Sequence, residues 1–279
     1  MAGVVPAASY GRNLALRVAS ALVLAPAAIG AAYLGGPLFA VFWVIAAIAV
    51  FWEWNGLVNS GGNALVFSAG AGALAVAAVL AERELPVLAV AVILAGSFSA
   101  AGLASRERRI WSAAGVGYAG AMLMAPIVLR HDATFGFAAL ALLFAIVWTT
   151  DVAGYFVGRL LGGPKLAPML SPNKSWSGAL GGTAVAVLVG LLVAGYLGIG
   201  NLVAIGVVSL ARSIVGQVGD LFESALKRRF GAKDSSTLIP GHGGVMDRLD
   251  AFWCAALVAA LTGLARGGFD APARGLMLW

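Results

Sequence analysis

Residues 177–198 read SGALGGTAVAVLVGLLVAGYLG and contain no charged side chain. A helix needs about 20 mainly apolar residues to cross the hydrocarbon core of a bilayer, and this stretch is long enough. The whole chain is also strongly apolar. Of its 279 residues, 61% are hydrophobic and 11% are charged, and its mean hydropathy is +0.94. Soluble domains carry about 25% charged residues. The composition therefore excludes a water-soluble domain, and the lack of strand-like alternation predicts an all-α polytopic integral membrane protein.

Outward from this stretch, the apolar runs predict about nine transmembrane helices. The predicted spans are Leu14–Leu34, Pro37–Trp54, Ala64–Leu80, Pro86–Leu103, Ile110–Leu129, Thr134–Leu161, Ser177–Gly198, Leu202–Leu226 and Ala251–Arg266. Glu53 and the Asn- and Gly-rich segment Asn55–Asn63 blur the boundary between the second and third spans. Polar groups concentrate after Asp151. We therefore expect residues 1–130 to form a transmembrane scaffold and residues 131–279 a catalytic region of the same membrane domain.

The charge pattern predicts which side of the membrane carries the chemistry. With nine spans, the N-terminus shares a side with every second loop, and that side receives most of the Lys and Arg residues. The other side receives Arg83, Arg130, Arg266 and Arg274. Cytoplasmic loops are the basic ones, so the N-terminus and the polar segments are predicted to be cytoplasmic. Such loops account for the net charge of +6 without a nucleic-acid partner, and the charge also suits an anionic lipid or nucleotide.

The first polar group lies near the end of the sixth predicted span. Asp151, Tyr155 and Arg159 are spaced i, i+4 and i+8, which places them on one helix face. A carboxylate in a membrane helix is costly and indicates a functional site. The alternative is a structural pair between Asp151 and Arg159 near the interface. Gly154 and Gly158 form a small-residue pair that would allow another helix to approach closely.

The second polar group is the loop that leads into the seventh predicted span. It contains prolines and glycines, the hydroxyl of Ser171, and the ammonium groups of Lys165 and Lys174. The free amides at the start of the following helix would point at this loop, so it is predicted to bind an anion. The alternative is an ordinary interfacial loop whose lysines meet anionic lipid headgroups.

The strongest signal joins the end of the eighth predicted span to the start of the ninth. Asp220, Glu223 and Lys227 are spaced i, i+3 and i+7 on one helix face, and Asp247 and Asp250 are spaced i, i+3 on the next. Carboxylates from two facing helices can hold Mg²⁺ together with substrate phosphates. The sequence therefore predicts a magnesium site at Asp220, Asp247 and Asp250.

Between these helices, the turn Pro240–Gly244 is flexible enough for the backbone of Gly243 and Gly244 to touch a phosphate. His242 is expected to hydrogen-bond a phosphate or ribose, with a metal-ligand or plain turn role as alternatives. Basic residues of the same segment would neutralise phosphates, and these are Lys227, Arg228, Arg229, Lys233 and Arg248. The alternative for this basic run is the positive-inside signal alone.

These residues resemble the phosphatidate cytidylyltransferase family. The family signature is similar to Ser-x-x-Lys-Arg-x₄-Lys-Asp-x₅-Pro-Gly-His-Gly-Gly-x-x-Asp-Arg-x-Asp. It is matched here by Ser224, Lys227, Arg228, Lys233, Asp234, Pro240 to Gly244, Asp247, Arg248 and Asp250. The segments around Asp151 and Lys174 also look like the family's. The chain departs from the family at Ser177, where a glutamate is usual.

The resemblance implies that CTP and phosphatidate react to give CDP-diacylglycerol and pyrophosphate, with one or two Mg²⁺ ions. The catalytic residues that we expect are Asp220, Lys227, Lys233, Asp247, Arg248 and Asp250. The implied substrate-binding residues are Asp151, Tyr155, Arg159, Ser171, Lys174, Ser224, Arg228, His242, Gly243 and Gly244. It further implies a homodimer among membrane lipids in a bacterial inner membrane. The alternatives are a CTP-dependent polyprenol or lipid kinase and an ion-coupled transporter, in which intramembrane charges would form the ion path.

Overall fold

The computed structural model describes residues 7–199, 201–241 and 243–279, and most of this chain is helical. The elements are α1 Ala7–Leu34, α2 Gly36–Val58, α3 Ala64–Glu82, α4 Pro86–Leu103, α5 Arg109–Arg130, α6 Gly136–Leu161, β1 Lys165–Ala167, β2 Ser171–Ser175, α7 Trp176–Tyr196, α8 Leu202–Arg229, α9 Met246–Gly267 and α10 Pro272–Met277. Within the described residues, the 8 helices from α2 to α9 are long and apolar enough to cross a membrane, and α1 has an apolar stretch at Ala19–Leu34. The predicted all-α polytopic membrane fold is confirmed.

Several element boundaries differ from the sequence prediction. Helix α9 begins at Met246, five residues before the predicted span, so Asp247 and Asp250 lie in its first turns. Helix α2 continues past Trp54 to Val58 and includes Glu53 as a buried residue. The predicted loop before α7 forms an antiparallel hairpin of β1 and β2, and the short helix α10 was not predicted. Apolar periodicity does not mark the start of α9, because its first turns are mainly polar.

The helices begin where the local sequence satisfies their first amides. The Asn63 side chain accepts hydrogen bonds from two amides of α3, and the Asn201 side chain caps α8 in the same way. The Ser175 hydroxyl accepts a hydrogen bond of 3.2 Å from the Gly178 amide at the start of α7. Short polar side chains at this position are preferred because they replace the missing intrahelical partner. The cap at Ser175 also connects α7 directly to β2.

Helices α6 and α7 pack at backbone distance, as the small-residue spacing predicted. A Cβ atom at Gly178 would lie 2.6 Å from the carbonyl oxygen of Gly154 and 3.2 Å from the Cα of Gly158. A Cβ at Gly182 would lie 3.0 Å from the Cα of Gly154. Glycine therefore allows α6 and α7 to approach closely, which is the usual device of membrane helix pairs. This contact places the polar face of α6 beside the hairpin that precedes α7.

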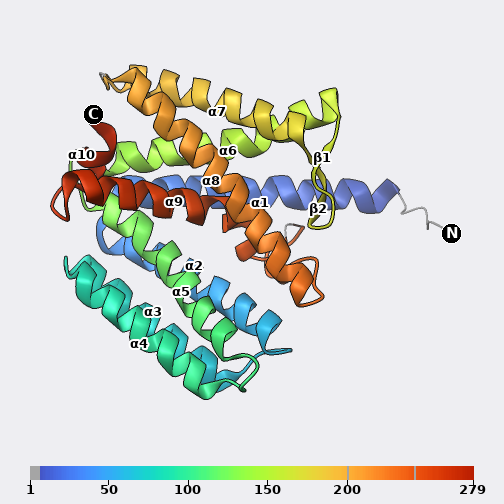
Figure 1. The fold of residues 1–279 in the computed structure, drawn as a ribbon, viewed down its shortest axis with the longest axis vertical. Helices are drawn as coiled ribbons and strands as arrows, with labels where there is room; N and C mark the ends of the chain where they lie inside the picture. Colours follow the sequence, from blue (N-terminus) through green and yellow to red (C-terminus); the bar gives the residue numbers. More distant parts are fainter. Residues whose placement is uncertain (1–6, 200, 242) are drawn as a thin grey trace.

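The polar connections gather at one end of the bundle. In Figure 1 the start of α1, the β1–β2 hairpin and the end of α8 lie on one side, whereas α10 and the α7–α8 turn lie on the other. Arg229 at the end of α8 lies 5.0 Å from the ring centre of Trp111, which places the start of α5 on that side too. These are elements that the charge pattern grouped together.

Candidate active site

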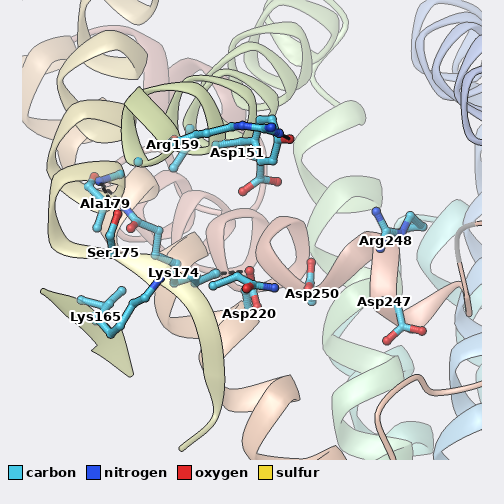
Figure 2. Close-up of a pocket in the computed structure, with 18 residues that line it drawn as sticks. Asp151, Arg159, Lys165, Lys174, Ser175, Ala179, Asp220, Asp247, Arg248 and Asp250 are labelled. Carbon is cyan, nitrogen blue, oxygen red and sulfur yellow. Dashed lines mark hydrogen bonds and ion pairs between the residues drawn. The ribbon is translucent and has the colours of Figure 1, made fainter. Parts of the chain in front are cut away.

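A cavity of about 600 Å³ opens between α6, the β1–β2 hairpin, α7, α8 and the start of α9. Many predicted site residues line it, namely Asp151, Tyr155, Arg159, Lys174, Asp220, Asp247, Arg248 and Asp250. Figure 2 shows that α6 carries Asp151 and Arg159, the hairpin carries Lys174, α8 carries Asp220 and α9 carries Asp250. Lys165 of the predicted anion-binding loop also lines the cavity, together with Asn173, Thr150 and Gln217, which were not predicted.

Carboxylates form one part of the cavity wall. Asp151, Asp220 and Asp250 are close enough to repel one another, and Lys174 attracts both Asp151 and Asp250. Lys174 forms an ion pair with Asp220, and Figure 2 shows Asp250 beside this pair. The arrangement concentrates negative charge at a place that a cation would stabilise. As they stand, no three Asp, Glu, His or Cys side chains of the described residues are grouped closely enough to hold a metal ion.

Cationic and hydrogen-bonding groups form the rest of the wall. Lys165 and Lys174 come from the hairpin, and Arg248 comes from the first turn of α9. The Arg159 Nη1 atom donates a hydrogen bond of 2.8 Å to the hydroxyl of Tyr155. No ion pair joins Asp151 to Arg159 in this part of the described structure. Asp151 and Arg159 therefore line the cavity and do not form the structural pair that was the alternative prediction.

The family is decided by comparison with known proteins. Residues 15–264 match the Cytidylyltransferase family. The chain is 42% identical over 261 residues to the phosphatidate cytidylyltransferase of Brucella suis biovar 1, a match that covers 93% of this chain and 97% of that relative. The protein of the same name from Brucella melitensis biotype 1 gives the same values. A phosphatidate cytidylyltransferase of Haemophilus influenzae is 42% identical over 130 residues, 45% of each chain.

The chain belongs to the cytidylyltransferase family. It is therefore a nucleotidyltransferase of the membrane, with the cavity as its candidate active site. The family signature runs from the end of α8 to the start of α9, and its two ends meet in a buried ion pair. The Lys227 Nζ atom lies 2.7 Å from Glu223 Oε2 and 2.5 Å from Asp247 Oδ1.

This ion pair changes what Lys227 and Asp247 can do. Lys227 is buried and does not line the cavity, so its ammonium group neutralises two carboxylates within the protein. Asp247 Oδ2 accepts hydrogen bonds from the amide of Gly244 at 2.8 Å and from the amide and hydroxyl of Ser235 at 3.0 Å each. Both oxygens of Asp247 therefore hold the signature segment together. Its assignment as a magnesium ligand stays a prediction.

Other predicted residues lie away from the cavity wall. Arg228 and Lys233 are exposed, and Arg228 donates a hydrogen bond to the carbonyl of Ala232. Ser171 pairs with Ala167 in the hairpin. The cavity-lining residues include none of Ser171, Ser224, Lys227, Arg228, Lys233, Gly243 and Gly244. His242 lies outside the described residues. Substrate contacts of these residues stay predictions.

Gly243 and Gly244 have a steric role in the described structure. Gly243 has a φ of 85°, a region that glycine adopts most readily. A Cβ at Gly243 would lie 2.7 Å from Asp247 Oδ2, and a Cβ at Gly244 would lie 2.5 Å from Glu53 Oε1. Gly243 and Gly244 therefore lie against two carboxylates, which leave no space for a larger residue at either position. Contact of its backbone with a phosphate stays a prediction.

Ser177, where the family usually has glutamate, joins the hairpin to α7. Its hydroxyl donates a hydrogen bond to the carbonyl of Gly162 and lies 3.0 Å from the hydroxyl of Ser175. Ser177 is not among the cavity-lining residues. The departure from the family pattern is therefore accommodated by a local hydrogen bond that connects the start of the loop to the start of the helix.

Sequence reasoning missed Glu53, which belongs to the region predicted as scaffold. Glu53 is only 2% exposed, and its carboxylate accepts hydrogen bonds from residues of the signature segment. The available signal was an acidic residue inside an apolar span, which is rare without a partner. Local spacing could not identify that partner, because Ser235 lies 182 residues further along the chain.

Proposed function

We propose that this protein is a phosphatidate cytidylyltransferase. It would catalyse the reaction of CTP with phosphatidate to give CDP-diacylglycerol and pyrophosphate. The observation that carries the proposal is the cavity, where carboxylates and cations from α6, the hairpin, α8 and α9 surround one space at the polar end of a membrane bundle. The Brucella relatives named for this activity match almost the whole chain, which supports the same proposal.

The chemistry suits the residues that line the cavity. An oxygen of the phosphatidate phosphate forms a bond to the α-phosphorus of CTP, and the bond between that phosphorus and the α–β bridging oxygen breaks. A phosphate monoester is largely ionised near neutral pH, since its second pKa is about 6, so no strong general base is required. Catalysis then depends on positioning and on charge stabilisation. Lys165, Lys174 and Arg248 would bind the triphosphate and stabilise the departing pyrophosphate.

The carboxylates of the cavity fit a divalent cation. Mg²⁺ needs only one or two protein carboxylates when waters and substrate phosphates complete its shell. Asp220 and Asp250 repel each other across the cavity wall, and we propose them as the holders, with Asp247 supporting the segment. When bound, the ion would neutralise phosphate charge. Asp151 and Arg159, with Tyr155, would orient the lipid headgroup.

The location of the cavity suits a lipid substrate that remains in the bilayer. The helix face next to the cavity on α6 presents exposed apolar side chains, with Phe156 57% and Leu160 82% exposed. Acyl chains can remain against this face while the headgroup enters the polar space. The charge pattern supports an active site on the cytoplasmic side, and the bacterial relatives support a bacterial inner membrane as its location. The homodimer that the family resemblance implies stays a prediction, and mass measurement in detergent would check it.

The decisive experiment uses the purified full-length chain in detergent with phosphatidate and Mg²⁺. CTP is labelled at the α-phosphate in one reaction and at the γ-phosphate in another. Label from the α-phosphate should enter the lipid, and label from the γ-phosphate should appear in pyrophosphate. A lipid kinase would instead transfer the γ-label to the lipid and release CDP. Solute movement in proteoliposomes without nucleotide turnover would point to a transporter and refute the proposal.

A further inference from the structure

We propose that Glu53 is a positioning residue of this enzyme. Its carboxylate would hold Ser235, Ser236, Val245 and Met246 in the positions in which α9 presents Arg248 and Asp250 to the cavity. The expected kinetic effects rest on the proposed function. The role of Glu53 in holding the segment rests on the structure alone. It assigns a role in the active site to α2, which belongs to the N-terminal half of the chain.

The contacts of Glu53 form a complete set. Oε1 accepts hydrogen bonds from the Ser236 hydroxyl at 2.7 Å and the Val245 amide at 2.8 Å. Oε2 accepts them from the Ser235 hydroxyl at 3.0 Å and the Met246 amide at 2.7 Å. The Val245 and Met246 amides place one donor at each oxygen, and the Ser235 hydroxyl, which has a single proton, lies between Glu53 Oε2 and Asp247 Oδ2. Both oxygens of Glu53 are therefore needed as hydrogen-bond acceptors.

The same contacts satisfy the start of α9. The first amides of a helix have no partner within the helix, and a buried helix start without partners is costly. The amides of Val245 and Met246 stand at this start, and α9 has no side-chain cap of its own there. Glu53 supplies the missing acceptors from another helix, and its negative charge also favours the positive end of the helix dipole.

A second carboxylate fixes the other face of the segment. Asp247 accepts hydrogen bonds from Ser235 and Gly244, and the Ser235 hydroxyl lies 3.0 Å from both Glu53 Oε2 and Asp247 Oδ2. Asp247 is itself held by Lys227 of α8. A continuous chain of polar contacts therefore runs from α2 through the signature segment to α8. Loss of the Glu53 carboxylate would release the start of α9, which carries the cavity residues Arg248 and Asp250.

Glutamine at position 53 tests this arrangement with almost no change of shape. One oxygen becomes an amide nitrogen, which has hydrogens where the carboxylate had lone pairs. In either orientation this nitrogen faces a backbone amide of Val245 or Met246, and neither can accept a hydrogen bond. Glu107→Gln is the matched control, because Glu107 is an exposed carboxylate at the same end of the bundle.

The experiment measures kcat, the KM values for CTP and phosphatidate, and thermal unfolding of the full chain in detergent. For Glu53→Gln we expect a fall in kcat of about tenfold to a hundredfold, with a KM for CTP within about threefold of the parent value. Glu107→Gln should match the parent protein. An unchanged kcat in Glu53→Gln would overturn the proposal, as would a loss of activity that only follows the fraction of unfolded protein.

A second readout does not depend on catalysis. A spin label is placed at Leu238, which is 51% exposed in the clamped segment, after replacement of the single cysteine by Cys254→Ala. Glu53→Gln should increase the mobility of the label in the folded protein, whereas Glu107→Gln should not. Unchanged mobility would overturn the clamp even if the enzyme is active. If the parent protein shows no cytidylyl transfer but Glu53→Gln still increases the mobility of the label, the result would count against the proposed function and not against the role of Glu53.

A milder variant serves if Glu53→Gln does not fold. Ser236→Ala removes one of the four donors and keeps the carboxylate. We expect a several-fold fall in kcat and an intermediate mobility of the label at Leu238. Parent-like values for both quantities would refute the proposal.

Discussion

Helices α6 and α7 carry two walls of the cavity, and a single added methyl group between them should separate these walls. Gly182 faces the backbone of α6, where a Cβ would lie 3.0 Å from both the nitrogen and the Cα of Gly154 and closer still to the carbonyl oxygen of Thr150. Gly182 itself does not line the cavity. Gly182→Ala therefore changes helix packing without touching a substrate.

The size of the effect follows from the atoms involved. The obstructing atoms belong to the backbone, so no rotamer change can relieve the overlap, and the helices must separate by roughly 1 Å to regain ordinary contact. Overpacking of this kind costs about 1–3 kcal/mol. Asp151 and Arg159 would move with α6 relative to Lys174, and a misplacement of about 1 Å can cost on the order of a hundredfold in rate.

The assay compares Gly182→Ala with Gly195→Ala on the same helix. A Cβ at Gly195 meets no atom within 4 Å, so this variant controls for the change from glycine to alanine. We expect Gly182→Ala to lower the transfer of α-phosphate label by about tenfold to a hundredfold and to lower the unfolding midpoint. Gly195→Ala should keep the parent values. Equal activity and stability of both variants would refute the packing argument.

Three further predictions concern the charges of the site. Lys227→Met removes the cation between Glu223 and Asp247 and should cost about 3–5 kcal/mol of stability, because it leaves buried charge uncompensated. Lys233→Met, at an exposed lysine, should leave the denaturation curve in detergent unchanged, and identical curves for the two variants would contradict the buried-pair argument. Asp250→Asn should abolish label transfer without unfolding the protein, and near-normal turnover would remove Asp250 from the catalytic set. EDTA should stop turnover and added Mg²⁺ should restore it, whereas full turnover in EDTA would exclude the magnesium proposal.

Much of the cavity could be predicted because it follows from spacing within single helices. Asp151, Tyr155 and Arg159 were expected on one helix face, and all three line the cavity. Asp220, Asp247 and Asp250 were expected to converge from neighbouring helices, and all three line the cavity. Helical geometry relates residues three and four apart wherever the helix lies, so such predictions need no tertiary information.

The surroundings of several charged residues could not be predicted in this way. Lys227 was expected to bind phosphate, but its ammonium group is buried between Glu223 and Asp247. Lys165 meets the cavity because the loop before α7 forms a hairpin. In both cases the residue type was noted correctly, and the packing of other elements determined what it contacts.

The sequence by itself determined that the protein is embedded in a membrane. It also determined which segments form helices and which carry the polar residues of the site. A chain with so few charges and such long apolar runs must be surrounded by lipid, and helical periodicity then assigns each polar side chain to one face of its helix. Only the tertiary structure decided that Glu53 meets Ser235 and Met246 and that Lys227 is closed off from the cavity. Such contacts join residues far apart in the chain, and a buried charge takes whichever partners the packed helices bring within hydrogen-bonding distance.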